Sequence, residues 1–230
     1  MAATTARSGS VDLDAHGLAP QGTAHWNLTT AELYEHTIRA DAGVIGNGGA
    51  LIVNTAPNTG RSPKDKFVVQ EPGSDERIWW GPVNTPISPA NNAQVRADLT
   101  AFLNEGDLYI LDAFAGSHPE HHVAVRVISN SAWHVLFAQT MLVTATPDEI
   151  AVHTPKVVIL HAPEFKADPE VHGTRTTGFV TLDFTAGEIL IGGTRYAGEI
   201  KKSVFTYMND RLPEHGVLPM HCSANVADDG

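Results

Sequence analysis

The chain has 230 residues, which is enough for one large domain or two small ones, and either size can bury a core. Its 42% hydrophobic and 18% charged residues are ordinary for a soluble globular protein, and the formal net charge of -11 disfavours nucleic acid or an anionic membrane as a partner. A single cysteine, Cys222, excludes an internal disulfide and favours a reducing cytoplasm. No apolar run approaches the ~20 residues that span a bilayer, and the N-terminus lacks a secretory-signal pattern.

The first quarter of the chain contains one clear helix signal. Residues 1–25 are rich in small and polar residues without an apolar period, so we expect a flexible N-terminal tail. Thr29 and Glu32 have the spacing of a capping box, which predicts a helix start. A loop at residues 43–49 then leads into a short strand at 50–54 that we expect to be buried.

A basic turn follows at residues 58–66, where glycine and proline surround three bases before a predicted strand at 67–70. The planar guanidinium of Arg61 suits bidentate recognition of a carboxylate or a phosphate, and Gly60 would let a ligand approach the backbone. A solvated basic turn is the simpler interpretation of this segment when it is taken alone.

The rest of the chain mixes helices and strands without strict alternation. This pattern indicates a mixed α/β (α+β) fold, in which helices flank a mixed β-sheet, and it fits one domain better than two. We expect helices at 88–106, at 131–141 and from 146 onward, and strands at 78–81, 108–114, 123–128, 156–161, 178–183, 188–191 and 217–226.

Residues 118–122 read His-Pro-Glu-His-His and invite a metal-site interpretation. Proline interrupts the segment, however, and no regular element spaces the ligands, so His118 and His121 would share a face only by accident. We therefore expect a surface loop here rather than a metal site.

Residues 192–206 contain the strongest functional signal. A predicted strand at 188–191 leads into a glycine-rich turn and then a helix that has Lys201 and Lys202 in its first turn. Exposed amides, bases and glycines at a helix start favour an anion site, although a solvated charged turn fits the spacing equally well. The chain contains neither a Gly-x-x-x-x-Gly-Lys-Ser/Thr phosphate loop nor a Gly-x-Gly-x-x-Gly motif after a strand.

Three segments, residues 59–67, 191–203 and 220–226, together closely resemble the N-terminal domain of ATP-dependent phosphoenolpyruvate carboxykinase. Residues 78–81 and 112–116 also match that family in its order, so the resemblance extends from about Trp26 onward. It implies the family's fold and its carboxy-lyase reaction in gluconeogenesis, in which oxaloacetate and ATP give phosphoenolpyruvate, CO2 and ADP.

The resemblance also implies roles for five residues. Arg61 would hold the carboxylate of the substrate, and Tyr196 would line the substrate and CO2 pocket, with packing as its alternative role. Lys202 would contact substrate and ATP phosphate and bind the metal, Lys201 would serve as a phosphate-side base, and His221 would bind the metal and touch the ATP phosphate. A lysine binds a metal only as a neutral amine, and nearby positive charges lower its pKa in that direction. Neutral imidazole is an ordinary Mn2+ ligand.

The domain organisation follows from the same resemblance. Residues 26–226 correspond to the substrate-binding domain, and 227–230 to the start of a nucleotide-binding domain, with Ala227 where the family has glycine. The remainder of the family's sequence carries the phosphate loop, a metal-binding aspartate and the adenine pocket. A fragment or a truncated gene product is thus a more economical interpretation than a stand-alone domain. Residues 54–57 form a loop where the family runs more directly, which would shift Arg61.

We therefore expect a cytoplasmic, monomeric chain that is inactive by itself. It would use Mn2+ (or Mg2+) and would take ATP as a cosubstrate held mostly by the absent domain. The alternative function is a stand-alone module that binds oxaloacetate or phosphoenolpyruvate without catalysis.

Overall fold

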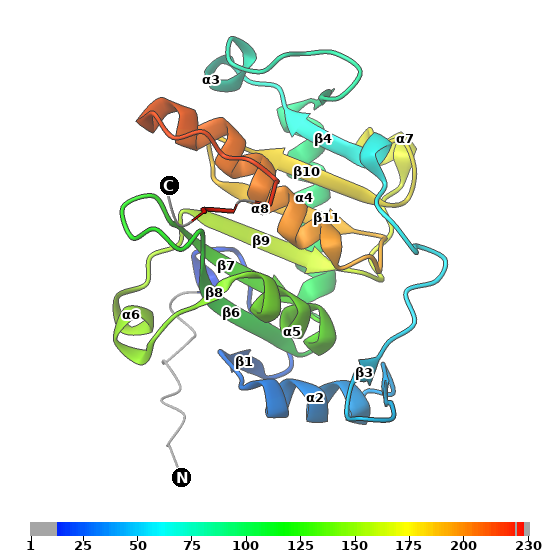
Figure 1. The fold of residues 1–230 in the computed structure, drawn as a ribbon. Helices are drawn as coiled ribbons and strands as arrows, with labels where there is room; N and C mark the ends of the chain where they lie inside the picture. The colour runs from blue at the N-terminus through cyan, green and yellow to red at the C-terminus, as the bar shows by residue number, and fades with distance from the viewer. Residues whose placement is uncertain (1–12, 224, 228–230) are drawn as a thin grey trace.

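The computed structural model describes residues 13–223 and 225–227, and it shows a nine-stranded mixed sheet flanked by helices (Figure 1). This confirms the predicted fold class. The sheet order is β1-β6-β7-β9-β11-β10-β4-β5, with β8 paired to β6. Its strands are β1 Ala24–Trp26, β4 Lys66–Val69, β5 Thr85–Ile87, β6 Leu108–Ala115, β7 Val123–Ser129, β8 Val143–Thr144, β9 Val157–Ala162, β10 Phe179–Asp183 and β11 Glu188–Gly192.

Helices cover both faces of this sheet. Helices α5 and α8 pack on one face and α4 on the other, as Figure 1 shows. The α-helices are α2 Thr30–Arg39, α3 Pro72–Asp75, α4 Pro89–Leu103, α5 Ala132–Met141, α6 Pro147–Val152, α7 Pro169–His172 and α8 Gly198–Arg211, and the 3-10 helices are η1 Pro63–Asp65 and η2 Leu212–His215. The predicted capping box at Thr29 is confirmed, and the helix expected from 146 onward starts with a second capping box, Thr146 with Glu149.

The core has two halves, one on each face of the sheet. Successive side chains of a strand point to opposite faces, so a central strand supplies both halves. In β9, Val157 and Ile159 belong to the half under α5 and α8, whereas Val158 and Leu160 belong to the half under α4. Each fully buried aliphatic side chain of this kind contributes about 1.5–3 kcal/mol to folding.

Strand direction decides which loops meet at the sheet edge. Strand β10 runs parallel to β4, with Val180 opposite Lys66, and antiparallel to β11, with Phe179 opposite Gly192. The start of β4 therefore lies at the same edge as the end of β11. This register brings the basic turn before β4 next to the glycine-rich turn that leads into α8.

The N-terminal prediction needs correction. Leu13 and Leu18 are 2% and 1% exposed and belong to the core half under α4, and β1 pairs with β6. The expectation of a flexible tail over 1–25 is therefore wrong for residues 13–25, because these leucines bury apolar surface against the sheet. Residues 1–12 lie outside the described part of the chain.

Two predictions about strands also need correction: the strand expected at 50–54 is formed at Leu51–Ile52 but is not buried, and the strand expected at 78–81 is absent. Residues 50–54 contribute to a separate exposed hairpin, β2 Val44–Ile45 with β3 Leu51–Ile52, and Ile52 is 55% exposed because this pair has no further sheet neighbour. Residues 78–81 form bends instead of a strand, since the Trp80 indole nitrogen donates to the carbonyl of Asp75 and closes a loop. Trp79 is 66% exposed rather than packed.

The strand expected at 217–226 is not formed by the described residues of that segment. Gly216 ends η2 in the left-handed conformation, at a φ of 73°, and Pro219 has no backbone N–H for a ladder. The exposed side chains of Leu218, Met220 and His221 follow along the surface.

Two charged side chains are paired inside the sheet. Asp112 and Arg126 face each other across β6 and β7 and are 1% and 2% exposed. The Arg126 guanidinium donates to both carboxylate oxygens of Asp112, at 2.7 and 3.1 Å, and lies 5.0 Å from the Trp26 ring centroid. The Nδ1 atom of His153 is 3.3 Å from the same carboxylate. Burial of this pair makes each charge depend on the other.

Two histidines are buried where α5 meets the sheet, with ring centroids 4.4 Å apart. His134 Nε2 donates to the Arg195 carbonyl at 3.1 Å, so its Nδ1 accepts from the Ser131 hydroxyl at 2.8 Å. His161 Nδ1 lies 2.8 Å from the hydroxyl of Ser129. Burial lowers the pKa of His161 to about 3, and burial followed by the charge of His161 lowers the pKa of His134 well below its ordinary value.

We expect the free energy of unfolding to fall as the pH is lowered from about 6.5 towards 3. In this window the unfolded chain takes up protons that the two folded histidines exclude, which costs about 1.4 kcal/mol per pH unit for each proton. Urea unfolding between pH 7 and pH 5 measures this slope, and His161→Asn should reduce it. An unchanged slope in that variant would show that His161 does not contribute.

Candidate active site

The helix α8 begins with its amides unprotected by a side-chain cap, directly after the glycine-rich turn. Gly193 has a φ of 63°, and a Cβ atom there would lie 2.3 Å from the carbonyl oxygen of Thr177, so the turn requires glycine. A Cβ atom on Gly198 would lie 2.6 Å from the ring of Tyr196. The half-buried Tyr196 side chain therefore rests against the first residue of the helix.

A buried carboxylate lies in the first turn of α8 and was not identified from the sequence. Glu199 is 3% exposed, and its Oε1 accepts a hydrogen bond from the Ser62 backbone N–H at 3.0 Å. Its Oε2 lies 3.7 Å from Arg61 Nε. Glu199 thus fastens the basic turn before β4 to the helix start. An acid beside two lysines was visible in the sequence, but its partner could not be assigned without the strand register.

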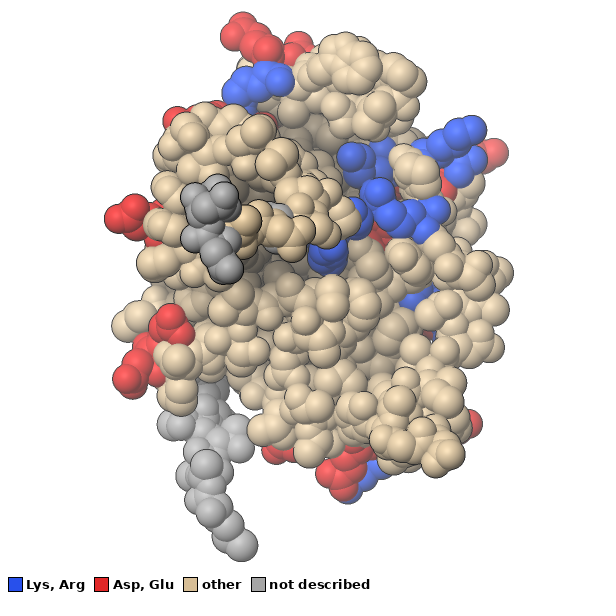
Figure 2. All heavy atoms as spheres, in the orientation of Figure 1, with Lys and Arg blue, Asp and Glu red and all other residues tan. Residues whose placement is uncertain are grey.

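Lys and Arg side chains gather on the face of the molecule that lies over the start of α8 and the neighbouring part of β4 (Figure 2). We call Arg61, Lys66, Lys201 and Lys202 the basic cluster. Partial desolvation, then the charges of Lys201 and Arg61, lower the pKa of Lys202, while Glu199 opposes this change. Burial and the charge of Arg61 likewise lower the pKa of Lys66. Glu199 interacts with Arg61 and Lys202 but does not offset all four bases, so the cluster favours an anion.

His221 joins the basic cluster from the C-terminal segment. The Lys201 ammonium donates to His221 Nε2 at 2.9 Å, so this nitrogen carries no proton and its lone pair accepts that bond. The Phe205 ring lies 5.7 Å from the His221 ring and 5.9 Å from Lys202 Nζ. Phe205, also missed in the sequence, is therefore a neighbour of both residues that were predicted to bind metal.

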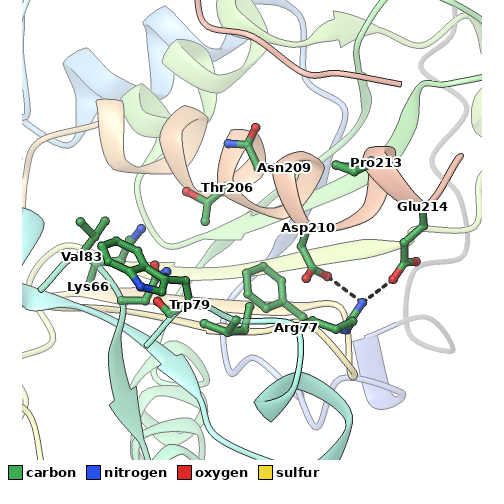
Figure 3. A pocket seen from close by; sticks show the side chains of 12 residues that line it. Lys66, Arg77, Trp79, Val83, Thr206, Asn209, Asp210, Pro213 and Glu214 are labelled. Carbon is green, nitrogen blue, oxygen red and sulfur yellow. Dashed lines mark hydrogen bonds and ion pairs between the residues drawn. The ribbon is translucent and has the colours of Figure 1, made fainter. Parts of the chain in front are cut away.

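Two cavities adjoin this region. A small one of about 90 Å³ lies between the basic turn and the glycine-rich turn, and it is lined by Ser62, Gly193 and Glu199 among others. A wider cleft of about 620 Å³ runs along the second half of α8 (Figure 3). Lys66 belongs to both the basic cluster and this cleft, and at the far end Arg77 bridges Asp210 and Glu214 at 3.5 and 2.6 Å.

The loop at residues 54–57 lies against the glycine-rich turn. The Arg195 guanidinium donates to the carbonyl of Asn54 and the Arg195 N–H to the Asn58 side chain, both at 3.4 Å. Arg195 also pairs with Glu164 at 2.7 Å. This loop is therefore held next to the residues that precede Tyr196.

The chain matches a family model described as phosphoenolpyruvate carboxykinase, of the ATP-dependent type, over residues 22–230. The chain belongs to this family. It is 47% identical over 222 residues to phosphoenolpyruvate carboxykinase (ATP) of Novosphingobium aromaticivorans, covering 96% of the chain and 42% of that relative. It is 45% identical over 222 residues to phosphoenolpyruvate carboxykinase (ATP) of Thermus thermophilus, covering 95% and 42%.

A third relative, phosphoenolpyruvate carboxykinase (ATP) of Azorhizobium caulinodans, is 42% identical over 230 residues, which is all of this chain and 43% of the relative. The chain thus spans about two fifths of the length of the phosphoenolpyruvate carboxykinases it matches. Among the residues that the structure describes, no helix combines the length and apolar character needed to cross a bilayer.

The side chains of Lys202 and His221 fit a divalent metal ion in part. Lys202 has a lowered pKa, which favours the neutral amine that a metal ion requires. His221 offers an unprotonated imidazole nitrogen. That nitrogen is occupied by Lys201, so metal binding through it would displace the lysine ammonium. Such a displacement would free Lys201 for an anion.

Proposed function

We propose that the basic cluster, with Tyr196 and His221, forms the oxaloacetate and phosphoenolpyruvate side of an ATP-dependent phosphoenolpyruvate carboxykinase site. The reaction converts oxaloacetate and ATP into phosphoenolpyruvate, CO2 and ADP. One observation carries the proposal. Ser62 and Glu199, 137 residues apart in the chain, bond to each other and so hold Arg61 and Lys202 around one helix start.

Each base has a chemical task in this proposal. The Arg61 fork holds a substrate carboxylate, because a guanidinium matches its two oxygens. Loss of CO2 from oxaloacetate leaves an enolate, and fixed positive charges stabilise it where its charge develops. Lys201 places a positive charge beside the phosphate, and Tyr196 lines the substrate and CO2 pocket. Glu199 is a positioning residue, since it holds Arg61 and the helix start together.

A divalent ion, Mn2+ or Mg2+, would be held by Lys202 and His221 together with other donors. When bound, it would supply positive charge to the enolate oxygen and to the transferred phosphoryl group. The contribution of this chain is a lysine whose pKa is lowered and a histidine nitrogen that would exchange its bond from Lys201 for the ion.

ATP binding needs groups beyond those in the sequence at hand, because the 230 residues contain no phosphate loop. We therefore propose that this chain by itself binds the small substrate and does not turn over ATP. A role in gluconeogenesis, a cytoplasmic location and a monomeric state belong to the same proposal, and the exposed single Cys222 is compatible with a reducing compartment.

The test is a titration of the 230-residue chain with Mn2+, with and without phosphoenolpyruvate. Binding is measured as the loss of the electron paramagnetic resonance signal of the free ion. We expect weak binding that phosphoenolpyruvate strengthens, and weaker retention of Mn2+ in Lys202→Ala and His221→Ala. His215→Ala, which removes an exposed histidine of η2, is the matched control. Equal Mn2+ retention in all variants would refute the metal assignment. Oxaloacetate-dependent ATP consumption by the chain alone would refute the claim of inactivity.

A further inference from the structure

We propose that the turn between β6 and β7 binds a divalent transition-metal ion, Zn2+, through His118, Glu120 and His121. One ligand atom of each residue lies within 4.8 Å of the others. The three residues belong to a different element from Lys202 and His221, so this site is independent of the proposed catalytic one.

The backbone of the turn creates this arrangement. The N–H groups of His121 and His122 both donate to the carbonyl of His118, at 3.0 and 2.8 Å. This one-turn coil places His118 and His121 on the same side, with stacked rings whose centroids are 4.8 Å apart. The expectation that they would share a face only by accident is therefore wrong, because Pro119 lies within the turn and does not interrupt it.

The three donors suit zinc. Two imidazoles and a carboxylate are ordinary Zn2+ ligands and leave a fourth position for water. His118 Nδ1 accepts the N–H of Glu120 at 3.3 Å, so this nitrogen is unprotonated and its hydrogen bond is long. Around a tetrahedral ion with bonds of about 2.0–2.1 Å, ligand atoms lie about 3.3 Å apart. Side-chain rotation can close the remaining gap, because His118 and Glu120 are exposed.

The turn is supported by two paired strands, and the negative net charge of the chain attracts cations. Strands β6 and β7 pair over seven consecutive positions below it. The His122 ring stacks on Phe114 at 4.3 Å, so the last histidine of the segment packs on β6. The net charge of -11 also favours the approach of a cation.

The experiment is a calorimetric Zn2+ titration of the 230-residue chain that carries His221→Ala, so that the catalytic histidine cannot contribute. We expect one bound ion and at least a tenfold loss of affinity in His118→Ala or His121→Ala, since even an outer-shell partner of a metal is worth about 10- to 100-fold. Glu120→Gln should weaken binding as well. His122→Ala and His215→Ala are the controls and should bind as before.

Histidine ring resonances provide a second readout. On addition of Zn2+, the nuclear magnetic resonance signals of the His118 and His121 rings should shift, whereas the His215 signals should not. Zn2+ affinity in the His118 and His121 variants equal to that of the controls, or ring shifts confined to other histidines, would overturn the proposal. Neither result depends on substrate or Mn2+ binding, so the Zn2+ site and the proposed function are tested independently.

Discussion

Replacement of Arg126 with methionine should lower the free energy of unfolding by about 3–5 kcal/mol. The substitution removes the guanidinium that bonds to both oxygens of Asp112 and leaves that carboxylate buried inside the sheet. Removing one partner of a buried ion pair has a cost of this size, because the remaining charge loses its bidentate partner without regaining water. Urea unfolding monitored by circular dichroism measures the change.

Arg39→Met is the control for this experiment. Arg39 is 68% exposed on α2 and pairs with the surface residue Glu35, so its loss should change stability by at most about 1 kcal/mol. A double variant, Asp112→Leu with Arg126→Met, should recover much of the loss, since it removes both charges. Equal effects of Arg126→Met and Arg39→Met would contradict the importance of the buried pair.

Replacement of Arg61 with alanine should weaken phosphoenolpyruvate binding by about 10- to 100-fold. Hydrogen bonds between charged groups contribute about 1.5–3 kcal/mol, and each factor of ten corresponds to about 1.4 kcal/mol. Glu199 keeps its bond from the Ser62 N–H in this variant, so the fold around the helix start should persist. Isothermal calorimetry on the 230-residue chain measures the affinity.

Two further variants make the result specific. Arg61→Lys keeps the charge but not the planar fork, so its affinity should lie between those of the wild type and Arg61→Ala. Arg39→Ala removes the same charge at a distant exposed position and should bind as the wild type does. Binding by Arg61→Ala as tight as by Arg39→Ala would rule out Arg61 as the carboxylate clamp.

Local signals in the sequence predicted local structure well. The helix starts at Thr29, Ser88 and Thr146 are confirmed, because a capping side chain bonds to an amide only three residues away. The buried strands in the second half of the chain were found for a similar reason, since each is a short continuous apolar run. The docking of Leu13 and Leu18 was missed, because two leucines in a polar segment form no periodic pattern.

Individual residues of the candidate site could be predicted from the sequence, but their contacts with one another could not. Arg61, Lys201 and Lys202 were identified by residue type and by resemblance, and each lies where α8 begins or next to it. The role of Glu199 could not be predicted, because its pairing depends on the direction of three strands. The proximity of His118 and His121 likewise depends on a single turn of backbone that no periodicity encodes.

The register of β4, β10 and β11 also has a consequence for folding. Ser62 and Glu199 meet across 137 residues, and contacts between such distant segments form late, because chain entropy opposes them until the intervening strands have paired. Assembly of the site thus depends on the prior pairing of these strands. A ligand that binds only the assembled site stabilises the native state by mass action. Substrate would therefore protect the whole central sheet against unfolding, and not only the helix end that it touches.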